Sequence, residues 1–305
     1  MGLIPAAFAE STVAREGDAG AAWLAELPGI IEDLLARWGC TVDGEVAYGQ
    51  VGVVVPVRDA ALKVSFPHPG NDHEPDAFEA WGGRGAVKLY ERDDARYAML
   101  LERAHPSTLS EHDQDVVTIA GVLHRQLTIP APDGLPRLSE QADGWAEELR
   151  KDDAELDHPL PAAVVDAALA VVDDLGRNQP EILIHGDFHP RNILSADREP
   201  WLAVDPKGHV GDPAFDAAIF LRTRAYHLFV GGLLADDLLR QLRAESGQFA
   251  EASGIDPERI GRWLQLIAVQ SSFGGRRHGF GRARGGSQLD EILRLIDKLA
   301  VSWTA

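Results

Sequence analysis

The first third of the chain alternates between helical and extended patterns of apolar residues. The segment "LPGIIEDLLARWG" repeats apolar residues at helical spacing, so we expect a helix with Pro28 in its first turn and Gly39 at its end. Residues 45–66 instead carry two β-branched runs joined by "RDA", which is typical of a β-hairpin. Residues 85–104 show a similar pattern around an Asp-Asp turn. The pattern therefore predicts a strand-rich region.

A short helix interrupts this strand-rich region. In "HEPDAFEAW" the residues Glu74, Phe78 and Trp81 recur at positions i, i+4 and i+7, which places them on one helical face. Glu79 falls off that face. We therefore expect Glu74, and not Glu79, to point inward.

Helical patterns dominate the rest of the chain. The segment "PAAVVDAALAVVDDLG" begins with Pro and ends with Gly, as helices do. Asp212 and Asp256 each precede a Pro, a pairing that combines an N-cap with a Pro at the first helical position. Between the two kinds of pattern, "ERAHPSTLS" loses its periodicity and contains a Pro. We therefore expect an α+β protein with a strand-rich lobe over residues 1–103 and a helical lobe over residues 104–305.

Composition limits what such a protein can be. The chain has 305 residues, of which 45% are hydrophobic and 25% charged, which fits a folded protein and argues against disorder. Its net charge of −19 opposes contact with nucleic acid or anionic lipid and suits cationic partners. Cys40 is the only cysteine, so an intramolecular disulfide and a Cys-rich metal site are excluded. With no membrane-length apolar run and no signal-peptide pattern, we expect a soluble cytoplasmic protein.

The stretch "ILIHGDFHPRNILSADREPWLAVDP" concentrates polar groups between short apolar runs. Asp187 and Asn192 are separated by four residues that include a Pro, and Asp205 follows the apolar run "WLAV", so we expect a strand–loop–strand arrangement. Mg²⁺ takes oxygen ligands and needs only one or two from protein when phosphates supply others. Asn192 and Asp205 can provide those oxygens, which leaves Asp187 to accept a proton from a substrate hydroxyl. Protein kinases space the same residue types in this way for phosphoryl transfer.

The strand-rich region supplies a cation for the same chemistry. Lys63 lies in "AALKVSF", the third expected strand, and a cation there can pair with the phosphates of ATP. A Glu from the following helix holds this Lys in kinases, and Glu74 is our candidate. Gly49 and Gly52, in "YGQVGV", allow the backbone to approach phosphate closely. This G-x-x-G spacing is less specific than the longer glycine motif of kinases.

These residues together resemble a known family. "HGDFHPRN" followed by "AVDP" is similar to the aminoglycoside phosphotransferase and choline-kinase superfamily, whose fold is protein-kinase-like. "VVVPVRDAALKVSF", "AWGGRGAVKLYERDDARYAMLLERA" and "EPWLAVDPKGHVGDPAFDAA" narrow the resemblance to the branch of streptomycin 6-kinase and hydroxyurea phosphotransferase. The likeness covers roughly residues 23–221.

The resemblance implies a role for each motif residue. Asp187 looks like the catalytic base, Lys63 and Glu74 like the phosphate-binding pair, and ATP is expected in a cleft between the lobes. The segment "LLERA" looks like the hinge, whose adenine contacts are expected at the carbonyl of Glu102 and the N–H of Ala104. The Mg²⁺ ligands are expected at Asn192 and Asp205. A position bracing the catalytic loop matches Asp216, and the structural His before the catalytic Asp matches His185.

One segment departs from that branch. Streptomycin carries two guanidinium groups, so its pocket should be acidic. Where the branch is expected to place a Trp and acidic residues, this chain has "SSFGGRRHGFGRARGG". Its arginines, whose role the sequence leaves open, are Arg276, Arg277, Arg282 and Arg284.

The sequence therefore predicts an ATP- and Mg²⁺-dependent O-phosphotransferase acting on a small molecule. The leading acceptor is a streptomycin-type aminoglycoside, which is cationic, and modifying it would give antibiotic resistance. Another hydroxylated metabolite or antibiotic is the alternative acceptor. Two rival classes stay open: a nucleotide-binding pseudokinase, and a metal-dependent hydrolase using His185, Asp187, His189 and Asp205.

Overall fold

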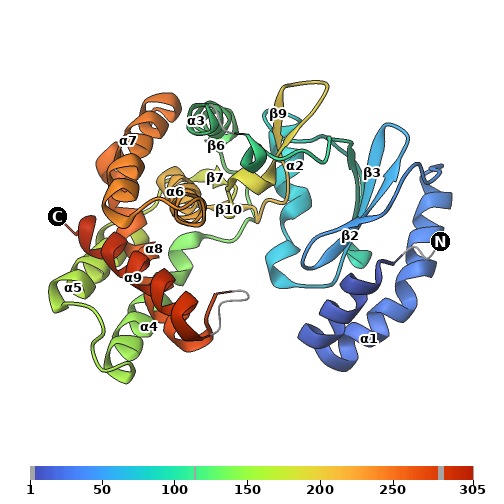
Figure 1. The fold of residues 1–305 in the computed structure, drawn as a ribbon. Helices are drawn as coiled ribbons and strands as arrows, with labels where there is room; N and C mark the ends of the chain where they lie inside the picture. Colours follow the sequence, from blue (N-terminus) through green and yellow to red (C-terminus); the bar gives the residue numbers. More distant parts are fainter. Residues whose placement is uncertain (1–3, 113–114, 281–284, 305) are drawn as a thin grey trace. The chain divides into compact units, whose positions relative to one another are not determined.

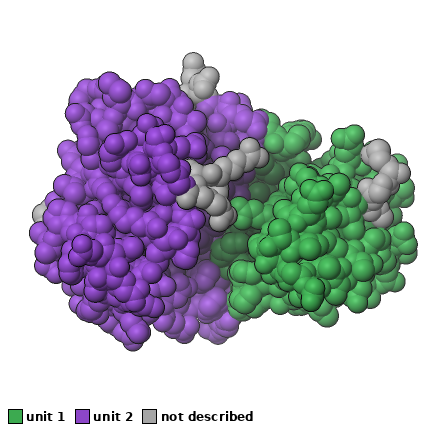
Figure 2. Space-filling model, turned by 60° about the horizontal axis from the view of Figure 1, so that its bottom comes forward, with its two compact units in different colours: residues 1–107, 194–207 green, residues 108–193, 208–305 purple. Residues whose placement is uncertain are grey.

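The computed structural model describes residues 4–112, 115–280 and 285–304. The chain divides into two compact units, coloured separately in Figure 2. Unit 1 comprises residues 1–107 and 194–207, and unit 2 comprises residues 108–193 and 208–305. This division differs from a single boundary near residue 103, because residues 194–207 return to the strand-rich unit.

Unit 1 is built on an antiparallel five-stranded sheet with the order β1-β2-β3-β5-β4. The strands are β1 (Ala47–Tyr48), β2 (Gly52–Val57), β3 (Ala60–Ser65), β4 (Leu89–Asp93) and β5 (Ala98–Glu102). The predicted hairpins are β2–β3 and β4–β5, and Figure 1 shows the first of them. Helix α2 (Glu74–Trp81) lies between them in the chain, as its 3.6-residue apolar spacing predicts.

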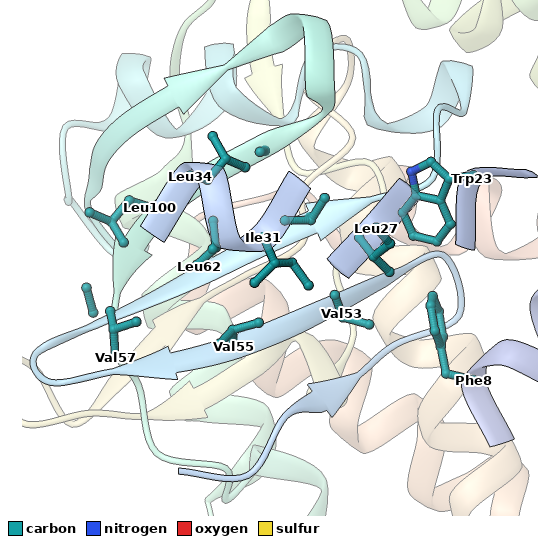
Figure 3. Packing of buried hydrophobic residues seen from close by; sticks show 13 residues of the cluster. Phe8, Trp23, Leu27, Ile31, Leu34, Val53, Val55, Val57, Leu62 and Leu100 are labelled. Atoms are coloured by element: carbon teal, nitrogen blue, oxygen red, sulfur yellow. The ribbon is translucent and has the colours of Figure 1, made fainter. Parts of the chain in front are cut away.

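Helix α1 (Ala6–Arg37) covers one face of this sheet (Figure 3). The helix buries Leu27, Ile31 and Leu34 against apolar side chains of β2 and β3, which forms the core of unit 1. The expectation that it starts near Pro28 is wrong, because Pro28 lies inside the helix. Its chain direction breaks once, at Gly17, where φ is 60°. Gly39 follows the last turn with φ 65°, the left-handed conformation that ends helices.

The hairpin of β8 (Ile193–Ser195) and β9 (Trp201–Ala203) explains why residues 194–207 belong to unit 1. The backbone N–H of Ala203 donates to the carbonyl of Gly85, and the N–H of Val87 donates to the carbonyl of Ala203. The N–H of Ser195 donates to the carbonyl of Ser107. These bonds carry the segment that ends in Asp205 onto the strand-rich unit.

Unit 2 is mainly helical. Its α-helices are α3 (Val116–Leu127), α4 (Ala142–Glu155), α5 (Ala162–Val171), α6 (Pro213–Val230), α7 (Ala235–Ser253), α8 (Pro257–His278) and α9 (Gly286–Ser302). A three-stranded sheet has the order β10-β7-β6, from β6 (Ile129–Pro130), β7 (Ile182–Ile184) and β10 (His209–Val210). The predicted N-caps are confirmed: Asp212 accepts from the N–H of Ala214, and Asp256 from that of Glu258. None of the helices described here is long and apolar enough to cross a membrane.

Candidate active site

Three predicted site residues meet in unit 1. The Lys63 ammonium, on β3, donates to Oε1 of Glu74 at 2.6 Å and to Oδ1 of Asp205 at 2.5 Å. The inward face of α2 presents Glu74, whereas Glu79 bonds Arg92 instead. The β8–β9 segment brings in Asp205, 142 residues after Lys63 in the chain. The strand, the helix and the returning hairpin thus assemble one charge cluster.

Burial and charge compete within this cluster. Burial lowers the pKa of Lys63, but the carboxylates of Asp205 and Glu74 outweigh it and hold that pKa above its ordinary value. Burial raises the pKa of Glu74 to about 7, although the neighbouring Lys63 ammonium opposes the increase. Lys63 is therefore a permanent cation. The side chain of Glu74 is only 1% exposed, so it serves as a fixed internal partner.

The carboxylate of Asp205 differs from that of Glu74 in its access to solvent. Its side chain is 38% exposed, so an incoming cation can reach it. Its backbone has φ 61°, an uncommon conformation for a residue other than Gly, and Asp is among the residues that tolerate it best. Such backbone strain costs about 1–3 kcal/mol and persists only where surrounding structure enforces it. Here the bond from Lys63 holds the Asp205 carboxylate in place.

The two predicted loop glycines have different surroundings. A Cβ on Gly52 would lie 2.8 Å from both Ser65 Oγ and the carbonyl oxygen of Val64. The absence of a side chain at Gly52 therefore permits the close pairing of β2 with β3, whatever else it does. A Cβ on Gly49 would meet nothing within 4 Å, so packing does not explain this glycine.

The predicted hinge residues also lie in unit 1. The N–H of Glu102, at the end of β5, donates to the carbonyl of Lys88, and its carboxylate receives two bonds of 2.8 Å from Arg198. Burial raises the pKa of Glu102, but the Arg198 bonds outweigh it and hold that pKa below its ordinary value. These contacts fix the end of β5 and the start of the following segment, where Ala104 lies. The adenine contacts of Glu102 and Ala104 remain a prediction.

Unit 2 presents the catalytic loop between β7 and β8. Asp187 follows β7, and a 3₁₀ turn over Pro190–Asn192 closes the loop, so the predicted strand–loop–strand arrangement is observed. The amide nitrogen of Asn192 donates to the carbonyl oxygen of Asp187 at 3.0 Å and lies 3.4 Å from its Oδ2. The two residues are therefore neighbours, as the spacing of four intervening residues predicts.

Each of the two predicted metal ligands, taken within its own unit, carries oxygen donors suited to a hard cation. Because the Asn192 nitrogen is engaged by Asp187, its Oδ1 is the side-chain atom that can act as an oxygen ligand. In unit 1, Asp205 offers an accessible carboxylate. The chemistry of both donors suits Mg²⁺, with phosphate oxygens and water as the remaining ligands. The ligand roles of Asn192 and Asp205 stay predictions.

A buried carboxylate braces the catalytic loop. Asp216, near the start of α6, accepts from the N–H of His185 at 2.7 Å and from that of Gly186 at 2.8 Å. His185 is fully buried, and its Nδ1 accepts from the N–H of Asp187 at 3.3 Å. Phe188 is also fully buried and packs edge-on against His124 and His185. The loop is thus anchored on both sides of Asp187. The sequence pattern identified Asp216 and His185 but not the anchoring role of Phe188.

The described arginines of the basic C-terminal segment pair with neighbouring acids. Arg276 pairs with Asp297 on α9, and Arg277 pairs with Asp152 and Glu155 on α4. The other two arginines singled out in this segment, Arg282 and Arg284, lie outside the described residues. The described arginines thus fasten helices of unit 2 together, a role that sequence spacing alone could not reveal.

Solved structures of other proteins share the fold of this chain. Its fold is similar to that of glucosamine kinase (TM-score 0.56, 15% identity, 88% of this chain and 80% of the other). It is also similar to choline kinase LicA from Streptococcus pneumoniae (TM-score 0.54, 14% identity, 91% and 99%). The α+β prediction with a kinase-like fold is therefore confirmed.

Sequence comparison identifies the family. The model of the aminoglycoside/hydroxyurea antibiotic resistance kinases matches residues 37–279. Streptomycin 6-kinase of Streptomyces glaucescens is 33% identical over 278 residues, covering 88% of this chain and 89% of that protein. Hydroxyurea phosphotransferase of Kitasatospora aureofaciens is 36% identical over 279 residues, covering 88% and 78%. The chain belongs to the aminoglycoside/hydroxyurea antibiotic resistance kinase family, which confirms the predicted resemblance.

Proposed function

We propose that the protein transfers the terminal phosphoryl group of ATP, with Mg²⁺, to a hydroxyl of a small molecule. The observation that carries this proposal is the bonding of Lys63 to both Glu74 and Asp205. Lys63 and Glu74 share a buried ion pair, and Asp205 exposes a carboxylate beside it. Family membership and the braced loop carrying Asp187 support the same reaction.

Each set of residues has a defined part in this reaction. Lys63 is a permanent cation suited to neutralise phosphate oxygens of the nucleotide. Asp187 accepts the hydroxyl proton as the acceptor oxygen bonds to phosphorus, and the broken bond leaves its electron pair on ADP. Asn192 and Asp205 would hold Mg²⁺, which neutralises phosphate charge when bound. We place the reaction in the cytoplasm, where ATP is available.

For the acceptor, we propose a streptomycin-type aminoglycoside, so that the product is an inactivated antibiotic. Two relatives are named for streptomycin phosphorylation at the 6 position, with 33% identity to this chain. The net charge of −19 supports a cationic acceptor through long-range attraction. A hydroxyurea-like acceptor is the second candidate, supported by the relative of that name at 36% identity.

The decisive experiment is an acceptor panel. The purified protein is incubated with Mg-ATP and with streptomycin, other aminoglycosides, hydroxyurea and hydroxylated metabolites, and mass spectrometry detects a gain of one phosphate. Asp187→Ala should lower the rate by about 10²–10⁴-fold while nucleotide affinity stays within about twofold. Near-full turnover by Asp187→Ala would refute the assignment of the base.

The two rival classes have less support. A pseudokinase should lack at least one of the four motif side chains, yet Lys63, Asp187, Asn192 and Asp205 are all present. A hydrolase of the predicted kind needs clustered metal ligands, and the described part of the chain contains no group of three or more His, Cys, Asp and Glu suited to a metal. Phosphoester hydrolysis with Zn²⁺ and without ATP would favour the hydrolase.

A further inference from the structure

A cavity in unit 2 opens beside the catalytic loop. Its volume is 350 Å³, and two of its lining residues, His189 and Arg222, interact with Asp187. His189 Nε2 lies 3.6 Å from Oδ1 of Asp187. The surrounding protein lowers the pKa of Arg222, and the charge of Asp187 opposes that decrease, so the two charges interact. Asp187, the proposed proton acceptor, is therefore a neighbour of the cavity lining at His189.

The polar wall of this cavity is basic. Arg191 and Arg222 line it together with His189 and His227, and the described lining residues include no Asp or Glu. Another part of the lining is apolar. It comes mainly from α9, through Ile292, Leu295, Ile296 and Leu299. A basic wall is notable in a chain with 48 acidic and only 29 basic residues, since chance placement would favour carboxylates.

Arg191, in the catalytic loop, and Arg222, on α6, differ in their pairing from neighbouring arginines of α6 and α8. Arg224 bonds both oxygens of Glu245, and Arg276 and Arg277 pair with acids. Neither Arg191 nor Arg222, by contrast, makes a hydrogen bond or ion pair with any residue that the structure describes, and both are exposed to the cavity solvent. Two guanidinium groups with unused donors that line the same cavity are suited to bind an oxyanion.

We infer that Arg222, assisted by Arg191, binds the phosphoryl group as it arrives on the acceptor oxygen. The inference rests on the proposed function, because Asp187 marks where the acceptor hydroxyl loses its proton. In that step the O–P bond to the acceptor forms, the bond to ADP breaks, and the proton passes to Asp187. The transferred group keeps its anionic oxygens throughout, and Arg222 offers a planar fork of donors to them.

The acceptors in the relatives' names, streptomycin and hydroxyurea, carry no anionic group that Arg191 and Arg222 could bind. Streptomycin carries guanidinium groups, and hydroxyurea has no ionised acid at neutral pH. The oxyanion chemistry of this wall therefore matches the phosphoryl group better than it matches the acceptor body. The same wall should hold the phosphorylated product and, more weakly, inorganic phosphate.

The test uses Arg222→Gln, Arg222→Lys and the double variant Arg191→Gln/Arg222→Gln. The matched control is Arg240→Gln, which removes the same charge from an exposed position on α7, where Arg240 pairs with Asp237. Steady-state kinetics with the active acceptor should show kcat lowered about 10²-fold in Arg222→Gln, with the acceptor KM within about threefold of wild type. Lys keeps the positive charge but lacks the planar pair of donors, so the kcat of Arg222→Lys should lie between those of wild type and Arg222→Gln. Arg240→Gln should match wild type.

A second measurement does not require turnover. Isothermal titration of the protein with inorganic phosphate should show affinity about tenfold weaker in Arg222→Gln and weaker again in the double variant. Unchanged kcat and unchanged phosphate affinity in Arg222→Gln would overturn the inference. So would a change confined to the KM of acceptors that carry an acid, because Arg222 would then recognise the acceptor.

The two measurements also separate this inference from the proposed function. If the enzyme is active but neither kcat nor phosphate affinity changes in Arg222→Gln, the kinase assignment holds and the proposed oxyanion subsite is refuted. Arg222-dependent phosphate binding in a protein that phosphorylates no acceptor refutes the proposed function and, with it, the role of Arg222 in transfer.

Discussion

The predicted site residues of the two units are held in different ways. In unit 1, charge attraction positions the side chains, because Lys63 bonds the carboxylates of Glu74 and Asp205. In unit 2, hydrogen bonds to the backbone position the catalytic loop, because Asp216 accepts from the N–H groups of His185 and Gly186. The phosphate-binding set should therefore respond to charge and pH. The position of the loop that carries Asp187 should depend mainly on Asp216, which accepts its backbone hydrogen bonds.

The largest expected effect comes from the brace of unit 2. Replacing Asp216 by Ala leaves the buried N–H of His185 and the half-buried N–H of Gly186 without their acceptor, at a cost of about 1–3 kcal/mol for a fully buried group. We expect Asp216→Ala to lower the free energy of unfolding by about 3 kcal/mol and to reduce kcat strongly. Urea unfolding measures the first effect. Asp197→Ala, at a side chain 93% exposed, is the control and should change stability little. Equal stability of the two variants would contradict the bracing role.

The next effect concerns the cation of unit 1. Lys63→Met leaves Glu74 buried without its counter-charge and removes the proposed phosphate contact. We expect the nucleotide Kd to rise at least about tenfold, measured by titration with Mg-ATP. Lys88→Met, at an exposed position in the same unit, is the matched control and should leave the Kd near that of wild type. Equal affinities in the two variants would separate Lys63 from nucleotide binding.

The raised pKa of Glu74 predicts that the activity depends on pH near neutrality. With that pKa raised to about 7, lowering the pH through 7 protonates Glu74 and removes its charge from Lys63. We expect kcat/KM to fall on this acid side, and Glu74→Gln to lose the acid limb while its maximum rate is reduced. A pH–rate profile from 5.5 to 8.5 measures both. An unchanged acid limb in Glu74→Gln would assign that limb to another group.

Stability should change in the opposite direction over the same window. The ordinary pKa of a Glu is 4.5, so between 4.5 and about 7 the folded protein holds a proton on Glu74 that the unfolded chain has released. Protonation then favours folding, and the contribution of Glu74 to the free energy of unfolding rises as pH falls. We expect wild type to gain stability relative to Glu74→Gln from pH 7.5 to pH 5.5 in urea unfolding. A constant difference between the two proteins would show that the pKa of Glu74 is not raised.

Local patterns in the sequence were sufficient for much of this arrangement. The helical spacing of Glu74 with Phe78 and Trp81 predicted that Glu74 faces inward, and the structure pairs it with Lys63. Capping chemistry placed the starts of α6 and α8 at Asp212 and Asp256. These predictions succeed because each depends on neighbouring residues and on backbone groups close in the chain.

Features that depend on distant contacts were not accessible in the same way. Helix α1 begins 22 residues before Pro28, and burial of Phe8 and Trp23 against the sheet of unit 1, not a local start signal, holds this part of it. The return of residues 194–207 to unit 1 depends on backbone bonds to Gly85 and Ser107. The availability of Arg222 depends on which acids lie near it in space. No spacing along the chain encodes any of these three.

The smallest expected effects come from Ala substitutions at Gly49 and Gly52, to which the G-x-x-G motif gave the same role. A Cβ at Gly52 would crowd Ser65 Oγ and the Val64 carbonyl at 2.8 Å, so Gly52→Ala should cost about 1–3 kcal/mol through displacement of β2 from β3. A Cβ at Gly49 meets nothing within 4 Å, so Gly49→Ala should leave the free energy of unfolding within about 0.5 kcal/mol. If backbone at Gly49 approaches phosphate, Gly49→Ala should still weaken Mg-ATP binding. Urea unfolding and nucleotide titration of both variants measure the two effects. Unchanged nucleotide affinity in Gly49→Ala would remove this turn from the phosphate site, and the charge cluster at Lys63 would remain as the phosphate contact of unit 1.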